Sequence, residues 1–327
     1  MMAQAHISVL LPEVLTSLGS VEGKLVVDGT FGAGGYSRAI LEAGARVVAF
    51  DRDARVMPYV EALKADYPDR FQWVNRCFSE MAEGLADLGY TACDAIVLDI
   101  GVSSMQLDEA ERGFSFMRDG PLDMRMSTEG RSAADIVNYD DKDDIAHLIW
   151  LYGEEHKSRG IAAAIVKRRE AQTFERTLDL AAVVERALGG RRGAAAHPAT
   201  RTFQGLRIAV NDELGELERA LNVAEHLLKP EGVLAVVTFH SLEDRIVKTF
   251  FNERAGKQPS GSRYAPLKIE NKASVYTLVT PKAVKAGAAE TAANPRARSA
   301  KLRAVRRTEA AAMSALPHQN QNQKVSS

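Results

Sequence analysis

Short apolar runs alternate with helical stretches over roughly the first hundred residues of the chain. Runs that can be buried on both faces are typical of strands in a parallel sheet, and a helix near 54–67 separates the second run from the third. The alternation returns near the C-terminus, where a Lys-Pro-Glu-Gly turn leads into another run. Strands are therefore predicted at 25–27, 46–50, 71–75, 94–98, 233–239, 275–279 and 301–305.

The alternation stops after Gln106 for about 100 residues, which is too long for an ordinary loop. Apolar residues in this stretch recur at helical spacing, and the sheet resumes after Phe203 with one long helix over 205–228. We predict a sheet domain at 1–106 and 204–307, an inserted helical domain at 107–203 and a disordered tail at 308–327. The helical core is predicted to contain Ile145, Leu148, Ile149, Tyr152, Ile161, Ile165, Leu178, Ala181, Val184 and Leu188.

Composition agrees with a chain of two domains. It has 327 residues, of which 46% are hydrophobic, and this is enough for one large core and a second module. No basic start precedes a long apolar run, and nowhere do eighteen apolar residues follow one another. Cys77 and Cys93 are too few for a disulfide framework or a metal site. We therefore expect a soluble, cytoplasmic protein with no metal and no membrane partner.

The net charge of −1 hides two basic segments. Residues 157–207 contain eleven Lys and Arg against four Asp and Glu, and residues 282–307 contain eight against one. Such segments usually form solvated helix faces. Two of them in an otherwise acidic chain favour a polyanionic partner such as a nucleic acid.

A glycine-rich loop follows the first predicted strand, which ends at Asp28. Gly34 and Gly35 would let a ligand approach the backbone, and a helix begins at about Tyr36. The dinucleotide-binding motif would need a third glycine where Ser37 stands. Asp28 ahead of the loop looks more like the acidic first motif of S-adenosylmethionine-dependent methyltransferases. A dehydrogenase and a plain tight turn remain as alternatives.

Polar residues at other strand ends are candidate ligand contacts. Asp51 could bind the two hydroxyls of a ribose, and Asp99 lies where an open α/β sheet presents its ligand crevice, although an Asp that closes a turn is an alternative. Phe78 could pack on an adenine ring or belong to the core. Ser241 with Asp244 matches a helix capping box, while the role of His240 stays open.

Eight stretches of the chain together closely resemble one family, the bacterial small-subunit ribosomal RNA cytosine-N4 methyltransferases, known as MraW or methyltransferase H. The most specific is Arg-Gly-Phe-Ser-Phe-Met-Arg-Asp-Gly-Pro-Leu-Asp-Met-Arg-Met at 112–126. The resemblance covers nearly the whole chain. The other stretches are 6–15, 28–36, 51–53, 98–104, 197–203, 239–245 and 294–303.

The resemblance implies an α/β, class I methyltransferase domain with a mostly parallel, seven-stranded sheet, interrupted by a helical substrate-recognition domain. It implies methylation of the exocyclic N4 amine of a decoding-site cytidine in 16S rRNA, with the small ribosomal subunit as partner. Tyr36 stands where the family more commonly has His. The resemblance implies that S-adenosylmethionine is bound by Gly34, Gly35, Tyr36, Asp51, Phe78, Asp99 and Gln106.

Methylation of an amine needs an acceptor for the amine protons. DNA amino-methyltransferases usually supply one from a (Ser/Asp/Asn)-Pro-Pro-(Tyr/Phe) motif, which this chain lacks. Asp99, Ser103 and Ser104 occupy the corresponding region, and we hypothesise that Asp99 orients the amine.

RNA binding has its own candidates. Phe114 and Phe116 could stack on a base, with Arg118 and Arg125 on phosphates, or could form a hydrophobic hinge between the domains. Lys167, Arg168 and Arg169 are predicted on the outer surface of the helical domain, where charge reversal should weaken RNA binding.

Two further functions stay open at this point. A small-molecule methyltransferase shares the fold but has little use for two basic segments and a helical insert. An S-adenosylmethionine-binding ribosome-assembly factor without turnover is harder to exclude. The sequence determines neither the oligomeric state nor whether free rRNA or an assembled subunit is the substrate.

Overall fold

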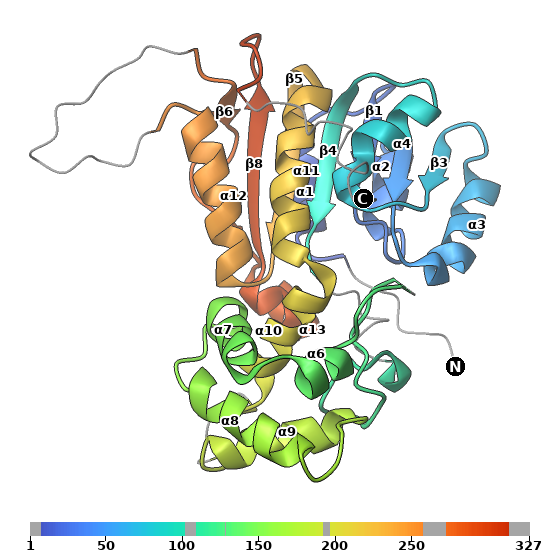
Figure 1. The fold of residues 1–327 in the computed structure, drawn as a ribbon. Helices are drawn as coiled ribbons and strands as arrows, with labels where there is room; N and C mark the ends of the chain where they lie inside the picture. The colour runs from blue at the N-terminus through green and yellow to red at the C-terminus, as the bar shows by residue number, and fades with distance from the viewer. Residues whose placement is uncertain (1–7, 102–108, 128, 192–196, 258–272, 314–327) are drawn as a thin grey trace, which may run out of the picture. The chain divides into compact units, whose positions relative to one another are not determined.

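The structure is a computed structural model that describes residues 8–101, 109–127, 129–191, 197–257 and 273–313 (Figure 1). The chain divides into two compact units. The first unit consists of Met1–Gly101 and Gly215–Ser327, and the second is Val102–Leu214. An α/β unit interrupted by an inserted unit is what the apolar pattern predicts.

A twisted sheet forms the first unit, with strand order β3-β2-β1-β4-β5-β8-β6. Strands β1 to β5 pair in parallel, whereas β8 is antiparallel to β5, β6 and β7. The seven predicted strands are confirmed, and the two-residue β7 is an addition that no apolar run indicates. The strands are β1 (Leu25–Asp28), β2 (Arg46–Phe50), β3 (Phe71–Val74), β4 (Cys93–Asp99), β5 (Leu228–Thr238), β6 (Tyr276–Leu278), β7 (Val284–Lys285) and β8 (Lys301–Arg307).

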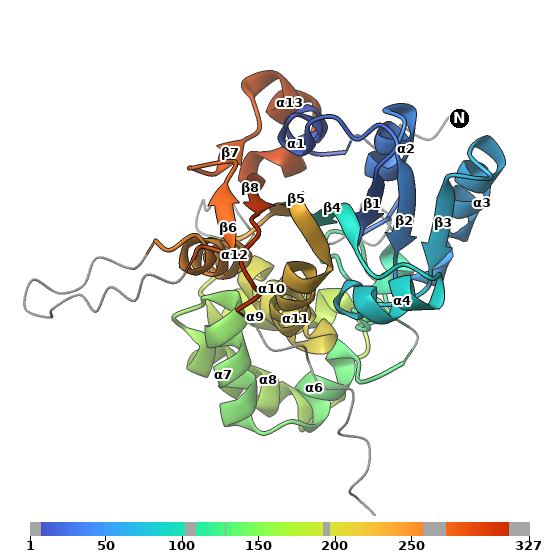
Figure 2. The ribbon, with the colours of Figure 1, turned by 90° about the horizontal axis from the view of Figure 1, so that it is seen from above.

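Helices cover both faces of this sheet, which explains why its central strands are apolar without alternation. On one face, α4 (Met81–Asp87), α11 (Glu213–Leu227) and α12 (Ser241–Arg254) share a core with the strands. Figure 2 shows α1 (Leu11–Leu18) and α2 (Gly35–Glu42) on the other face. The same unit contains α3 (Met57–Asp66) and α13 (Ala288–Ala293).

The single long helix predicted over 205–228 is wrong, because the structure has two helices there. Helix α10 (Thr200–Asn211) ends at Asp212, whose φ of 48° is left-handed, and α11 begins at Glu213. A left-handed residue cannot continue a right-handed helix. The inserted unit accordingly includes α10 and extends to Leu214, beyond the predicted end at 203.

The second unit has its own helical core, as predicted. Most of the predicted apolar stripe is buried in it, but Leu178 is 44% exposed, and its neighbours Leu180 and Val183 are buried instead. A helix turns by about 100° per residue, so a shift of two positions changes the face. The helices are α6 (Ala133–Tyr139), α7 (Lys142–Gly153), α8 (Ser158–Arg169), α9 (Thr177–Ala187) and α10.

Residues 308–313, at the start of the tail predicted to be disordered, form hydrogen bonds with the first unit. The Thr308 N–H donates to the Val275 carbonyl at 2.9 Å, and the N–H of Met313 donates to Glu225. The rest of the tail lies outside the described residues.

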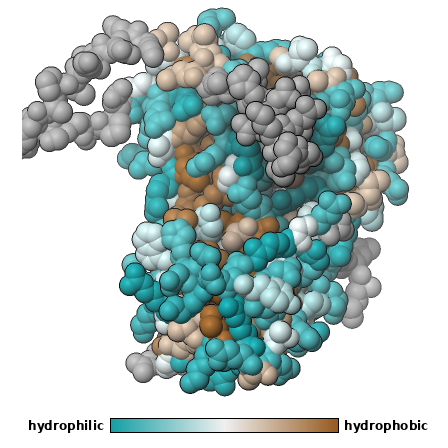
Figure 3. Space-filling view, viewed as in Figure 1, coloured by the Kyte–Doolittle hydropathy of each residue, from teal (hydrophilic) through white to brown (hydrophobic). Residues whose placement is uncertain are grey.

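Most of the face seen in Figure 3 is hydrophilic, with apolar side chains in small patches. None of the helices in the described part of the chain is long and apolar enough to cross a membrane.

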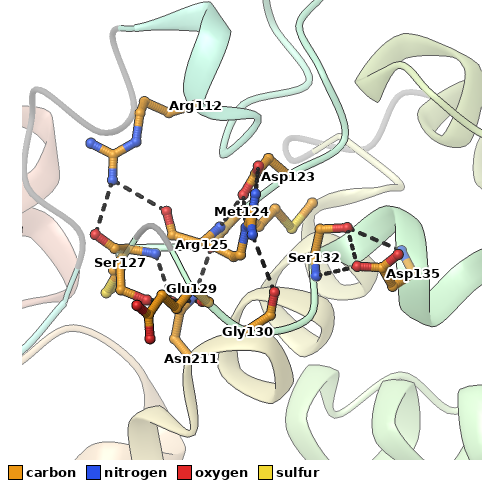
Figure 4. Close-up of polar contacts among 11 residues, drawn as sticks. Arg112, Asp123, Met124, Arg125, Ser127, Glu129, Gly130, Ser132, Asp135 and Asn211 are labelled. Carbon is orange, nitrogen blue, oxygen red and sulfur yellow. Dashed lines mark hydrogen bonds and ion pairs between the residues drawn. The ribbon is translucent and has the colours of Figure 1, made fainter.

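The stretch 112–126 forms a loop held by its own backbone (Figure 4). The buried Arg112 donates to the carbonyls of Arg125 and Met126, at 3.2 and 3.4 Å. Asn211 of α10 binds the last residues of the loop, because its amide nitrogen donates to the Met124 carbonyl at 2.7 Å and its oxygen accepts from the Met126 N–H at 2.8 Å. Gly120 is required, since a Cβ there would lie 1.8 Å from the Ala110 carbonyl oxygen.

We predict that Asn211→Ala destabilises the second unit by about 2–4 kcal/mol, because it leaves a buried carbonyl and a buried N–H without partners. Urea unfolding followed by circular dichroism measures the loss. Gln204→Ala on the same helix removes one partly buried bond to the Tyr152 carbonyl and should cost about 1 kcal/mol. Equal losses for the two variants would contradict the role of Asn211.

Candidate cofactor site

Three carboxylates lie at the carboxyl ends of neighbouring strands. Asp28 ends β1, Asp51 follows β2 and Asp99 ends β4. Strand β1 lies between the other two, and Asp28 is in register with Ala49 on one side and Val97 on the other. The strand order therefore brings Asp51 and Asp99, far apart in sequence, to the same edge of the sheet as the glycine loop.

The glycine loop is tied to both neighbouring strands. Toward β2, the Phe31 N–H donates to the Phe50 carbonyl at 2.9 Å, and the Gly32 N–H donates to Asp51 Oδ2 at 2.8 Å. Toward β4, the Asp99 N–H donates to Thr30 Oγ1 at 2.7 Å. The loop is thus fixed between the two strands by hydrogen bonds.

Helix α2 begins at Gly35, directly after the loop, and Gly34 precedes it with a φ of 78°. The N-cap residue, Gly34, has no side chain that could cap the helix, and the Asp28 carboxylate accepts from the N–H of Ser37, the third helical residue. The N–H groups that start a helix have no partner within it, so those of Gly35 and Tyr36 suit an anionic ligand. Gly35 also permits a close approach by the N-terminal segment, since a Cβ there would lie 1.9 Å from Ser8 Oγ. Tyr36 is buried, and its hydroxyl donates to the Val9 carbonyl. The Tyr36 side chain is therefore committed to packing, which leaves its backbone for a ligand.

Burial raises the pKa of both Asp28 and Asp51 to about 6, despite hydrogen bonds that favour the ionised form. For Asp28 these come from the Ser37 hydroxyl at 2.7 Å and the Thr30 N–H at 3.2 Å. Asp51 Oδ1 accepts from the Asp53 N–H at 2.8 Å. Each oxygen of a carboxylate can accept a further hydrogen bond, so Asp51 can still receive ribose hydroxyls.

Asp99 is the most electrostatically strained of the three. Its Oδ1 is buried and has no hydrogen-bond partner among the described residues. Burial raises the pKa of Asp99 well above its usual range, and the nearby carboxylates of Asp28 and Glu243 raise it further. A buried acceptor without a partner is uncommon in a native fold and is a reason to expect a ligand there.

The helix cap after β5 is one residue earlier than predicted from Ser241 and Asp244. His240 is the N-cap of α12, and its Nδ1 accepts from the Glu243 N–H at 3.4 Å. The fully buried Glu243 accepts in return from the His240 and Phe239 N–H groups, at 3.1 and 2.7 Å. Asp244 instead pairs with Lys301 and Arg303 of β8. Sequence reasoning overlooked Glu243, although its spacing from His240 is that of a capping box.

Phe78 begins a short 3₁₀ helix, η2 (Phe78–Glu80), beside the start of the glycine loop. Its Cβ is 3.1 Å from the point where a Cβ on Gly29 would stand, and the ring also packs against the sheet core. This position fits both interpretations of Phe78 made from the sequence. Ser103, Ser104 and Gln106 lie outside the described residues.

The two candidate stacking aromatics belong to the interior of the helical unit. Phe114 is 5% exposed and lies in the helical core. Phe116 is half-buried, with its ring centroid 4.6 Å from that of His197 and 5.1 Å from that of Phe203. Phe114 is thus not available to stack on a base in this structure, whereas part of Phe116 is.

The candidate phosphate-binding residues also differ from one another. Arg118 is exposed, but Arg125 forms a two-pronged ion pair with Asp123 at 2.7 and 2.9 Å. Of the three basic residues that end α8, only Lys167 is exposed. The other two are partly buried, so they are less exposed than predicted. Arg168 pairs with Asp179 at 2.7 Å, and Arg169 donates to the carbonyls of Val137 and Asp140.

The edge of the sheet offers the donors and acceptors that S-adenosylmethionine requires. A carboxylate at the end of β2 suits a ribose, and the first N–H groups of a helix whose N-cap is a glycine suit the methionyl carboxylate. The buried Asp99 Oδ1, without a partner in the part of the chain that the structure describes, suits a neighbouring cation or hydrogen-bond donor. The residues present therefore fit this cofactor.

The strand order, with its antiparallel β8, and the acidic edge beside the glycine loop define a class I S-adenosylmethionine-dependent methyltransferase fold. The model of the MraW methylase family matches residues 3–308, so the chain belongs to that family of S-adenosylmethionine-dependent enzymes.

Curated relatives agree with this assignment. The chain is 61% identical to ribosomal RNA small subunit methyltransferase H of Caulobacter vibrioides, over 95% of this chain and 98% of that protein. The protein of the same name from Hyphomonas neptunium is 53% identical, over 93% of this chain and 89% of the relative.

The raised pKa of Asp28 predicts a pH-dependent stability. The folded state binds the Asp28 proton more tightly than the unfolded state, so this contribution is complete below about pH 4 and is lost as the pH rises through about 6. Asp28→Asn has no carboxyl group to ionise and so avoids this loss. Its free energy of unfolding relative to the parent should therefore rise by about 3 kcal/mol from pH 4 to pH 7. Urea unfolding of both proteins at the two pH values measures the difference.

Asp94→Asn serves as a control, because its stability relative to the parent should change with pH in the opposite direction. Although partial burial opposes it, hydrogen bonds from the Leu25 N–H and Lys229 lower the pKa of Asp94. This variant should therefore lose stability relative to the parent as the pH rises from about 3 to 5. A pH-independent difference between Asp28→Asn and the parent would refute the buried-acid interpretation.

Proposed function

We propose that this chain transfers a methyl group from S-adenosylmethionine to the exocyclic N4 amine of a decoding-site cytidine in 16S rRNA. The observation that carries the proposal is the buried Asp99 Oδ1, which has no hydrogen-bond partner among the described residues and lies beside the glycine loop, at the end of a strand in a methyltransferase sheet. The shared name of the relatives supports small-subunit rRNA as the substrate. The cytosine-N4 target rests on the resemblance of the motifs. Action on ribosomal RNA would require a cytoplasmic location.

Several groups would hold the cofactor. Asp51 would accept hydrogen bonds from the ribose hydroxyls, the N–H groups of Gly35 and Tyr36 would bind the methionyl carboxylate, and Phe78 would pack on the adenine. When bound, the cofactor supplies an electrophilic methyl group on a sulfonium. Its positive charge favours the ionised form of Asp99, because an opposite charge lowers the pKa of a carboxyl group.

The amine of cytosine is a weak nucleophile because its lone pair is delocalised into the ring. An acceptor on an amine hydrogen helps the nitrogen to pyramidalise and afterwards takes the proton. Asp99 is the described candidate for this role, and Ser103 and Ser104 are the alternatives. Holding amine and methyl group in line can remove about 7–11 kcal/mol of the barrier, so positioning supplies much of the catalysis.

The test is an assay with a mapped product. Purified protein is incubated with labelled S-adenosylmethionine and small subunits from a strain that lacks the enzyme, and the labelled nucleoside is mapped by mass spectrometry. N4-methylated cytidine at one decoding-site position is expected. Label on another atom would overturn the target, and cofactor binding without any product would identify a non-catalytic assembly factor. Robust turnover of a free nucleoside would favour a small-molecule enzyme.

We predict that Asp99→Asn lowers the rate of methyl transfer by about 10²–10⁴-fold at saturating RNA and cofactor, since the amide cannot take the proton. Single-turnover kinetics measures this rate, and circular dichroism checks the fold. Asp94→Asn, at the other end of the same strand, should transfer at the parental rate. The proposed role of Asp99 is wrong if its folded variant does so too.

A further inference from the structure

The basic segment 282–307 contains eight Lys and Arg, which differ in whether their side chains have partners in the structure. Lys301 and Arg303 pair with Asp244 at 2.8 and 2.7 Å, and Arg306 lies 3.5 Å from Glu231. Arg307 is buried and donates to the carbonyls of Glu225 and Thr308. These four basic groups each have an acidic or carbonyl partner, and the partly buried Arg296 also has contacts within the structure.

Three others form a different group, which we call the β7 basic surface: Lys282, Lys285 and Arg298. All three are exposed, and none has an ion pair or side-chain hydrogen bond with another described residue. Lys285 belongs to β7 and Lys282 lies just before it. Arg298 lies in the 3₁₀ helix η4 (Pro295–Ser299), which contacts β7. The three charges therefore come from segments that pack together.

The acidic residues closest in sequence do not neutralise this surface. Glu290 is the only acidic residue of the segment, and its carboxylate accepts the Leu10 N–H at 2.7 Å. Lys285 lies directly opposite Lys301 in the β7–β8 pair, and like charges in that position are destabilising. Lys301 donates to Asp244, whereas the Lys285 side chain is exposed to solvent.

Strand register places the β7 basic surface at the same edge of the sheet as Asp99. Asp99 of β4 pairs with Val237 of β5, Val237 pairs with Leu302 of β8, and Leu302 pairs with Val284 of β7. Because neighbouring strands are about 4.8 Å apart, Val284 lies roughly 14 Å from Asp99 along this row. Figure 2 shows β7 and α13 at the β8 side of the sheet.

We infer that Lys282, Lys285 and Arg298 bind RNA phosphates next to the target nucleotide, an inference that rests on the proposed function. A row of free cations a few strands from the acceptor position can hold the backbone of an RNA strand whose base reaches Asp99. The contacts are electrostatic and independent of sequence, so they contribute affinity and orientation rather than base choice.

The test compares two triple variants with the same change in net charge. Lys282→Gln, Lys285→Gln and Arg298→Gln are combined in one protein. Lys24→Gln, Lys64→Gln and Lys248→Gln, all exposed residues of the same unit and distant in sequence from β7, are combined in the control. Binding of 16S rRNA is measured between 50 and 200 mM salt, and methyl transfer to small subunits is measured in parallel.

Loss of the β7 basic surface should reduce the slope of log K against log salt by about 2, because each phosphate contact on a single strand contributes about 0.7. The KM for subunits should rise at least about tenfold, with kcat at saturating subunits and cofactor affinity unchanged. A conservative variant that combines Lys282→Arg and Lys285→Arg and keeps Arg298 should have the parental slope. The control triple should behave as the parent.

Two results would overturn the inference: a parental slope and KM in the first triple variant, or equal losses in the control. The salt slope needs no turnover. If the parent binds RNA but transfers no methyl group, the proposed function fails, while the comparison of slopes still decides whether this surface binds RNA.

Discussion

Burial of the carboxyl groups of Asp28, Asp51 and Asp99 at one edge of the sheet is the constraint on which the methyltransferase unit depends. Removing carboxylates from water is costly unless they are neutral or meet positive charge and donors. Hydrogen bonds from the glycine loop and Ser37 offset part of this cost for Asp28 and Asp51. Asp99 Oδ1 has no such bond with a described residue, so this edge suits a cationic ligand.

The three acids lie beside a glycine loop that is bonded to both neighbouring strands. Adjacent parallel strands end together, so the loop after β1 can bond to β2 on one side and to β4 on the other. A methyl group and an amine that are held in line react by direct displacement, without a covalent intermediate. Positioning of the reactants can therefore supply much of the catalysis.

Basic residues in the two units have different uses. In the helical unit, Arg112, Arg168 and Arg169 donate to backbone carbonyls or pair with an acid, and they hold loops and helix ends in place. In the sheet unit, Asp244 captures two cations of β8 and leaves the neighbouring lysine of β7 exposed. A count of Lys and Arg along a segment therefore overestimates the charge that the segment presents at its surface.

The α/β class, the seven main strands, the helical insert and the strand-end acids can all be predicted from the sequence. Each of these follows from local apolar runs and from residues directly after them. Three other features become visible only in the folded chain: the break of the predicted long helix at Asp212, the cap formed by His240 and Glu243, and the burial of Phe114. The fold also sets which arginines have partners. These features depend on backbone dihedrals and on contacts between residues far apart in the sequence. The residues next to a charge or a ring in the sequence do not show which partner the fold will bring to it.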